Sequence, residues 1–171
     1  MLSPAMNDRL TRVGPGTPMG TLMRRYWQPI AGTSQLSEEN PTKEIRLLGE
    51  DLVLFRSTAG KLGLIEPSCP HRKANLSYGV PEPEGIRCAY HGWLFDEAGN
   101  CVDQPSEPAG SRFKDKVKLK AYKVEELGGI IFGYMGPEPA PLLPKRDVLT
   151  WDGVRETSII ELPCNWLQCQ E

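Results

Sequence analysis

Two stretches of this 171-residue chain decide its fold: CPHRKANLSYG at residues 69–79 and GIRCAYHGWLFDEAGNC at residues 85–101. The first places Cys69 and His71 in the spacing C-x-H, and the second places Cys88 and His91 in the spacing C-x-x-H. Such short spacings direct both side chains of a pair from one tight loop toward one point. Pro70 assists by fixing its own φ and disfavouring helix at Cys69. The chain has only two histidines and both lie in this pattern, so we predict a four-ligand metal site.

The distribution of ligand types over the two loops distinguishes between metals. A structural zinc commonly takes two cysteines from one arm and two histidines from the other. Here each arm carries one of each. This mixture suits a [2Fe–2S] cluster in which Cys69 and Cys88 hold one iron while His71 and His91 hold the other, the ligand set of a Rieske centre. A structural zinc site and four unrelated residues remain the alternatives.

Composition excludes several classes of protein. The formal net charge of -2 lacks the basic balance of a nucleic-acid binder. No apolar run approaches the ~18 residues of a membrane span, and the N-terminus has neither the charged start nor the apolar stretch of a secretory signal. Five irregularly spaced cysteines do not form a disulfide framework in a chain of this length. We predict a cytoplasmic protein with no nucleic-acid or membrane partner.

Repeated strand–turn–strand patterns predict an antiparallel all-β domain that ends near Met135-Gly136. The three predicted hairpins pair residues 52–55 with 62–65, 93–95 with 101–102, and 119–124 with 130–134. One short helix, from Pro18 to Trp27, is expected before them. Thr17 can cap it, and its apolar residues recur at helical spacing. We interpret this helix as packed on its own domain, with a partner-docking helix as the alternative.

Two further segments have strand-like patterns. In residues 116–121 lysines alternate with apolar residues, as in a strand with one wet face. Such lysines either steer an acidic electron-transfer partner or keep an edge strand soluble. Residues 157–162 are the second candidate strand, and the proline-rich run PEPAPLLP before it is typical of a stiff linker. These boundaries predict an N-terminal helical segment at 1–30, an all-β domain at 31–136, a linker at 137–150 and the truncated start of another domain at 151–171.

The remaining cysteines and the tryptophan near the second pair have simpler interpretations. Cys101, Cys164 and Cys169 lack a second ligand at metal-binding spacing, and we predict small buried thiols at all three positions. Trp93 is expected to pack beneath the second loop rather than to carry electrons, because tryptophan usually serves as core.

The chain resembles the N-terminal part of the α subunit of Rieske non-haem iron oxygenases, and within these the phthalate dioxygenase group. The matching segments span nearly the whole chain. They are GPGTPM at 14–19, RYWQP at 25–29, the two stretches quoted above, FKDKVKLKAY at 113–122 and CNWLQ at 164–168. The resemblance implies a Rieske [2Fe–2S] domain of antiparallel sheets with a short N-terminal helix, followed by the truncated start of an α+β catalytic domain.

Two features of the loops bear on strain and on redox potential. Lys73 stands where the group commonly has glycine, so a requirement for positive φ there would strain the loop. High-potential Rieske proteins carry an extra cysteine in each cluster loop, bridged as a disulfide. Here Tyr90 and the residues after His71 supply no such pair. Because fewer donors then face the cluster sulfurs, we expect a low potential, which suits an electron donor to an oxygen-activating iron.

The resemblance also implies a function for the parent protein. It would be an oxidoreductase that inserts O2-derived oxygen into an aromatic or similar apolar acid, by hydroxylation or demethylation. Its electrons would come from an NAD(P)H-dependent reductase or a ferredoxin, and its subunits would form a homo-oligomer, expected to be trimer-based.

The same resemblance places the catalytic iron outside this chain. The family binds a mononuclear Fe(II) through two histidines and one carboxylate, and both histidines here serve the cluster. We therefore expect a fragment that lacks the catalytic domain, contains no catalytic residue and performs no oxygenation alone. The alternative is a stand-alone Rieske ferredoxin, which would need neither the proline-rich linker nor the segment after it.

Overall fold

Antiparallel strands form two sheets in the computed structural model, which describes residues 2–170. The larger sheet has the order β1-β10-β9-β4-β3-β2, and the smaller has the order β5-β6-β7-β8. The strands are β1 (Gln28–Gly32), β2 (Thr42–Leu47), β3 (Glu50–Arg56), β4 (Leu62–Ile65), β5 (Val80–Glu82), β6 (Gly85–Arg87), β7 (Leu94–Phe95), β8 (Cys101–Asp103), β9 (Ala121–Leu127) and β10 (Ile130–Tyr134). The prediction of an antiparallel all-β domain is confirmed.

The helices are short and lie outside the sheets. They are α1 (Pro4–Thr11), α2 (Pro18–Met23) and α3 (Asp147–Thr150), with 3-10 turns η1 (Thr33–Gln35), η2 (Leu76–Tyr78) and η3 (Phe113–Lys116). None of the helices within residues 2–170 is long and apolar enough to cross a membrane.

The three predicted hairpins form with antiparallel registers: β3 pairs with β4, β7 with β8, and β9 with β10. Each hairpin turn contains the glycine that a tight turn requires. Gly60, Gly99, Gly128 and Gly129 all have positive φ, which glycine adopts without steric cost.

The larger sheet separates two hydrophobic cores, and the sequence of β3 explains how. Successive side chains of a strand point to opposite faces. Val53 and Phe55 face the core shared with the smaller sheet, whereas Leu52 and Leu54 face the core on the other side. A strand buried on both faces is expected to be continuously apolar, as the LVLF run is. The first core also contains Cys69 and Cys88, so both predicted ligand loops are anchored in it.

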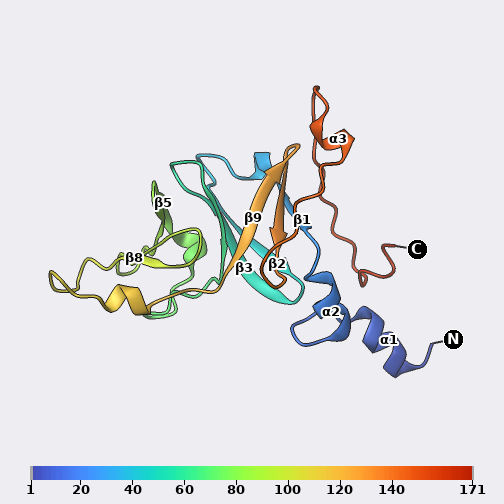
Figure 1. Ribbon diagram of the computed structural model, residues 1–171, viewed down its shortest axis with the longest axis horizontal. Coiled ribbons are helices and arrows are strands. Elements are labelled where there is room, and N and C mark those ends of the chain that lie inside the picture. The colour runs from blue at the N-terminus through green and yellow to red at the C-terminus, as the bar shows by residue number, and fades with distance from the viewer. Residues whose placement is uncertain (1, 171) are drawn as a thin grey trace.

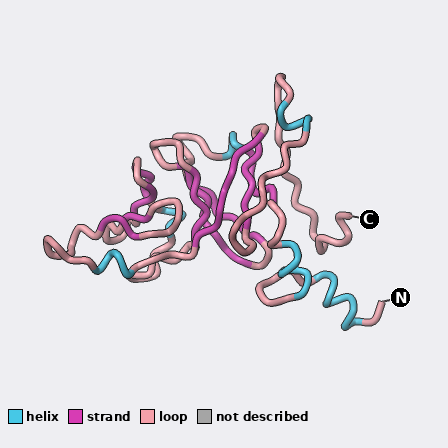
Figure 2. Tube along the Cα trace, in the orientation of Figure 1, coloured by secondary structure: helices cyan, strands magenta, loops and turns pink. Residues whose placement is uncertain are grey.

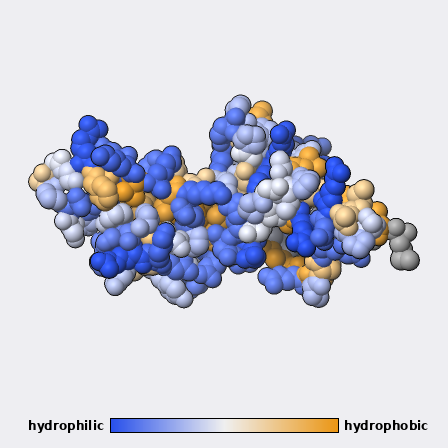
Figure 3. Space-filling view, turned by 90° about the horizontal axis from the view of Figure 1, so that it is seen from below, coloured by the Kyte–Doolittle hydropathy of each residue, from blue (hydrophilic) through white to orange (hydrophobic). Residues whose placement is uncertain are grey.

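The molecule is elongated, with the smaller sheet at one end and both termini at the other (Figure 1). Around β5 and β8 the chain is mostly loop, as the pink tube in Figure 2 shows. The face seen in Figure 3 is mainly hydrophilic, with hydrophobic patches toward the two ends of the long axis.

The helix predictions were only partly right. Thr17 caps α2 by accepting the Gly20 N–H at 3.1 Å, and Pro18 occupies its first turn, as expected. However, α2 ends at Met23 rather than Trp27, because the next residues must turn the chain into β1 and Pro29 disfavours helix just before it. The structure also has an earlier helix, α1, which we did not predict although Ser3 caps it.

Both additional strand predictions were wrong. Lys116 ends the 3-10 turn η3, and β9 begins only at Ala121, so the alternating lysines precede the strand. They cross between the two sheets, where an isolated bridge joins Lys118 to Asn100. Residues 157–162 form no strand because no neighbouring strand pairs with them, and a lone extended segment leaves its backbone groups to water.

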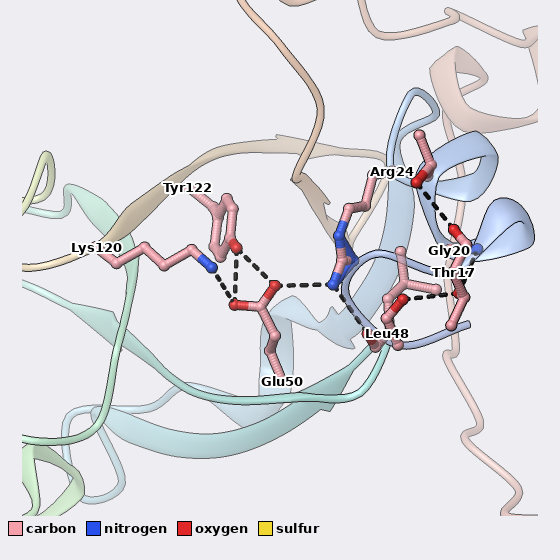
Figure 4. A network of polar contacts seen from close by, with 9 residues as sticks. Thr17, Gly20, Arg24, Leu48, Glu50, Lys120 and Tyr122 are labelled. Carbon is pink, nitrogen blue, oxygen red and sulfur yellow. Dashed lines mark hydrogen bonds and ion pairs between the residues drawn. The ribbon is translucent and has the colours of Figure 1, made fainter. Parts of the chain in front are cut away.

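A polar network joins α2 to the larger sheet (Figure 4). Glu50 accepts hydrogen bonds from Arg24 at 2.8 Å, from Lys120 at 2.5 Å and from the Tyr122 hydroxyl at 2.8 and 2.9 Å. Arg24 also donates to the Leu48 carbonyl at 3.0 Å, in the two-residue β2–β3 turn. Burial alone would raise the pKa of Glu50, but the hydrogen bonds from Lys120 and Tyr122 and the charges of Lys120 and Arg24 outweigh it and lower that pKa.

This network predicts a pH dependence of stability. A lowered carboxylate pKa contributes stability that is present above the ordinary glutamate value of about 4.3 and is lost as the pH falls through the folded-state pKa. Glu50→Gln should lower the free energy of unfolding by about 1–2 kcal/mol at neutral pH. It should also weaken the acid limb, the fall in stability with decreasing pH, as measured by urea unfolding. Asp51→Asn, in an exposed pair with Arg46, is the control and should change stability little. An unchanged acid limb in Glu50→Gln would contradict the assignment.

Candidate metal centre

Each predicted ligand pair lies in a loop that joins elements of the first core. Cys69 and His71 lie between β4 and η2, while Cys88 and His91 lie between β6 and β7. The two cysteines belong to one buried cluster of side chains, and the two imidazole rings are in edge contact with centroids 4.5 Å apart. The fold thus brings together loops sixteen residues apart, as the sequence predicted.

The two loops share one backbone hydrogen-bond pattern. The carbonyl of Cys69 accepts the N–H of Lys73 at 2.8 Å, and the carbonyl of Cys88 accepts the N–H of Gly92 at 3.0 Å, four residues on in both cases. The cysteine N–H groups donate five residues on, to the carbonyls of Ala74 and Trp93. Equivalent positions also share a positive φ, 59° at Lys73 and 78° at Gly92. The strain anticipated at Lys73 is therefore present.

This strain gives a direct prediction. A non-glycine residue in the left-handed region costs about 1 kcal/mol, so Lys73→Gly should raise the free energy of unfolding by up to that amount. Lys118→Gly is the control, because Lys118 has ordinary φ and glycine there only adds freedom to the unfolded chain. Urea unfolding of both variants should give shifts of opposite sign. Destabilisation by Lys73→Gly would show that Lys73 contributes contacts that outweigh its strain.

Sulfur and nitrogen donors lie at different depths. Cys69 and Cys88 are 1% and 3% exposed, whereas His71 and His91 are on the surface. Trp93 is buried against the first core and stacks on His71, with ring centroids 4.8 Å apart and planes 7° from parallel. Trp93 therefore serves as core, as predicted, and the ligand ring on which it stacks belongs to the first loop. Tyr90 is exposed, and its ring centroid lies 3.9 Å from that of His91.

Burial disfavours the charged forms of two of the four predicted ligands, Cys69 and His91. Burial raises the pKa of the Cys69 thiol to about 11, although the backbone N–H of His71 opposes this by donating toward the sulfur. The pKa of His91 is lowered, first by desolvation and then by the nearby His71 and Arg72. A neutral imidazole is the form that binds metal, and a bound metal displaces the thiol proton. The donor set therefore fits a metal cofactor that supplies positive charge.

Within residues 2–170 no three or more His, Cys, Asp and Glu side chains are gathered as tightly as one metal ion requires. The four donors instead form a buried cysteine pair and an exposed histidine pair. A cluster of two irons needs two such pairs.

The other cysteines behave differently from one another. Cys101 is 6% exposed and its Sγ donates to the Asp103 carbonyl at 3.5 Å, so the prediction of a small buried thiol is confirmed. Burial raises the pKa of Cys101 to about 11. For Cys164 and Cys169 the prediction was wrong. Both are exposed, with sulfurs 3.6 Å apart, and lie in a segment that forms neither helix nor strand.

Sequence reasoning missed one residue beside the second loop. Arg87 directly precedes Cys88, and its guanidinium contacts the Gly92 carbonyl together with the carboxylates of Glu82 and Asp103. The only signal was its place next to a ligand at the end of a strand, which many arginines share.

Comparison with known proteins identifies a family that includes the same two loops. The family model for the Rieske [2Fe-2S] domain matches residues 26–123. The chain belongs to the Rieske [2Fe-2S] domain family. Its matched region contains β1 to β8, the first residues of β9 and both ligand loops.

The chain is homologous to the oxygenase subunits of Rieske oxygenases. It is 53% identical to the 5,5'-dehydrodivanillate O-demethylase oxygenase subunit of Sphingobium sp. (strain NBRC 103272 / SYK-6), covering 100% of this chain and 41% of that protein. It is 45% identical to the phthalate 4,5-dioxygenase oxygenase subunit of Pseudomonas putida, covering 100% and 40%. The expected phthalate dioxygenase-like membership is thereby confirmed, and the chain spans about 40% of the length of these relatives.

A solved structure of the same architecture includes an electron-transfer protein. It is the carbazole-bound oxygenase of carbazole 1,9a-dioxygenase in complex with ferredoxin, at 29% identity and a TM-score of 0.62, covering 79% of this chain and 33% of that one.

Proposed function

We propose that Cys69, His71, Cys88 and His91 hold a Rieske [2Fe–2S] cluster and that this chain is the electron-delivering part of an aromatic-ring oxygenase. One observation carries the proposal: two buried thiols and two exposed imidazoles meet on two loops that have the same backbone hydrogen-bond pattern. When bound, the cluster would supply one-electron transfer between a reductase and a mononuclear iron.

The protein side chains have separable tasks in this proposal. Cys69 and Cys88 would hold the inner iron away from water, within the first core. His71 and His91 would hold the outer iron at the surface, with their outward N–H groups free to donate to a carboxylate across an interface. Trp93 orients His71 by stacking on it.

The position of the loops supports delivery to a neighbouring subunit. The smaller sheet and its loops occupy one end of the molecule, while the C-terminal end of the chain lies toward the other (Figure 1). A catalytic domain that starts within residues 151–171 and continues beyond them, as the greater length of the relatives supports, would start away from the cluster of its own chain. We propose a homo-oligomeric parent, in keeping with the trimer-based expectation, whose catalytic iron faces the cluster of another subunit.

The substrate class rests on the relatives alone. One is named as a 5,5'-dehydrodivanillate O-demethylase and another as a phthalate 4,5-dioxygenase, so we propose an aromatic substrate and either hydroxylation or demethylation. An NAD(P)H-dependent reductase or a ferredoxin would be the donor, and the ferredoxin complex of the carbazole oxygenase supports this kind of partner. A cytoplasmic location stays a prediction.

Anaerobic reduction tests the electron-transfer part. The chain, loaded with cluster, is mixed with NADH and a reductase of the phthalate dioxygenase type. We expect the cluster to take up one electron per chain, seen as a loss of visible absorption. We expect no oxygenated product when air is admitted. Bleaching with no dependence on reductase, or no bleaching at all, would contradict the proposal.

The reading frame of the gene after codon 171 distinguishes an oxygenase from an electron carrier. An open frame beyond codon 171 that supplies two histidines and a carboxylate would support the oxygenase. An immediate stop codon would favour the stand-alone Rieske ferredoxin instead.

A further inference from the structure

Arg87 makes four directed contacts beside the second loop. Its guanidinium binds both Glu82 oxygens, at 2.5 and 2.7 Å, and one Asp103 oxygen at 2.8 Å. Nη1 also donates to the carbonyl of Gly92 at 2.5 Å. Gly92 lies between His91, a predicted ligand, and Trp93, whose ring stacks on His71. The Arg87 side chain therefore binds the backbone between these two residues.

The partners of Arg87 come from the two edges of the smaller sheet. Glu82 ends β5 and Asp103 ends β8, whereas Arg87 ends β6, between them in the sheet order. The guanidinium therefore ties both edge strands to the second loop. Among the described residues, the first loop has no side-chain hydrogen bond to the equivalent carbonyl, that of Lys73.

Directed geometry, rather than Coulomb attraction, is the main contribution of these contacts. The side chains of Arg87, Glu82 and Asp103 are 25%, 33% and 44% exposed, and solvent screens ion pairs at such positions. What remains is the planar fork, which holds a carboxylate and a carbonyl in fixed directions at once. A lysine ammonium is a point charge on a flexible stem and cannot make the same set of contacts.

We propose that Arg87 is the positioning residue of the second loop: by fixing the Gly92 carbonyl it sets the direction of the His91 imidazole toward the cluster. This inference rests on the proposed function, because it takes His91 to be a ligand. The Gly92 N–H closes the loop onto the Cys88 carbonyl at 3.0 Å, so a rotated Gly92 peptide would disturb both ligands of this loop.

The test compares Arg87→Lys with a matched control, Arg56→Lys. Arg56 is 26% exposed, pairs with Glu126 at 2.9 Å and donates to the Gly60 carbonyl at 3.5 Å, but lies on the larger sheet. Both variants keep the charge. The readouts on the full 171-residue chain are the principal g values of the reduced cluster, its reduction potential and its rate of loss to a chelator.

Arg87→Lys should shift the g values and the potential, because the Gly92 peptide, and with it the His91 imidazole at the outer iron, is then held less firmly. It should also lose cluster about tenfold faster, as expected for removing a charged hydrogen bond. Arg56→Lys should match the wild type in all three. Equal g values and equal potential in Arg87→Lys would overturn the inference, even if that variant is less stable, since a purely structural role moves stability alone.

Two further outcomes keep the test decisive. A wild-type chain without a Rieske signal would refute the proposed function rather than the role of Arg87. If Arg87→Lys retains no cluster, the same measurements are made on Glu82→Gln. This variant weakens the carboxylate contact of Arg87 and leaves its contact with the Gly92 carbonyl. A shift of its g values and potential away from those of the wild type supports the inference, and unchanged values overturn it.

Discussion

A chain carrying Cys88→Ser is expected to take up no [2Fe–2S] cluster, with iron and sulfide content more than about tenfold below the wild type. The reason is that Cys88 is a proposed ligand of the inner iron, and even residues outside a ligand set cost about 10–100-fold in metal affinity when mutated. Cys88 is 3% exposed and belongs to the first core together with Cys69. Iron and sulfide analysis after reconstitution measures the effect.

Cys101→Ser is the control for this experiment. Cys101 is 6% exposed and lies in the same core. The Cys101→Ser variant therefore places a serine hydroxyl in the same buried surroundings. It should lower stability slightly and retain the cluster. Equal cluster content in the two variants, whether full or absent, would contradict the assignment of Cys88 as a ligand that Cys101 is not.

The second large effect is expected for Gly85→Ala, which should destabilise the chain by about 3 kcal/mol and abolish cluster binding. Gly85 opens β6, the strand that leads into Cys88, with φ 153°. A Cβ there would lie 1.9 Å from the carbonyl oxygen of Phe95 in β7, the strand that leaves the second loop. The clash is with backbone, so β6 and β7 would have to separate.

Gly153→Ala separates this clash from backbone strain. Gly153 has nearly the same φ, 147°, but no atom lies within 4 Å of its hypothetical Cβ. Urea unfolding should show a small loss for Gly153→Ala and a large one for Gly85→Ala. Similar losses would mean that φ, and not the approach of β7, dictates glycine at position 85.

Much of the fold could be predicted because its signals are local. The hairpins were predictable from glycine turns between apolar runs, and the metal loops from four residues at short spacing. The ends of elements were less predictable. Nothing within residues 18–27 indicates that the helix stops at Met23, because the requirement to enter β1 comes from pairing with β10, far away in sequence.

Long-range pairing also explains the other errors. The alternation of Lys116, Lys118 and Lys120 is typical of a strand, but the segment crosses between two sheets and pairs only once, at Lys118. The contacts of Arg87 were equally invisible. They depend on Glu82 and Asp103 meeting at one point, which the order of strands in the smaller sheet brings about. By contrast, the strain at Lys73 was predictable because a family pattern marks that position.

The most direct test of the central claim is the metal and sulfide content of the purified chain, measured with the electron paramagnetic resonance spectrum after reduction. The account predicts a coloured protein with about two irons and two acid-labile sulfides per chain and a Rieske-type signal. A colourless protein with one zinc and no sulfide would contradict it, and would make Cys69, His71, Cys88 and His91 a structural zinc site.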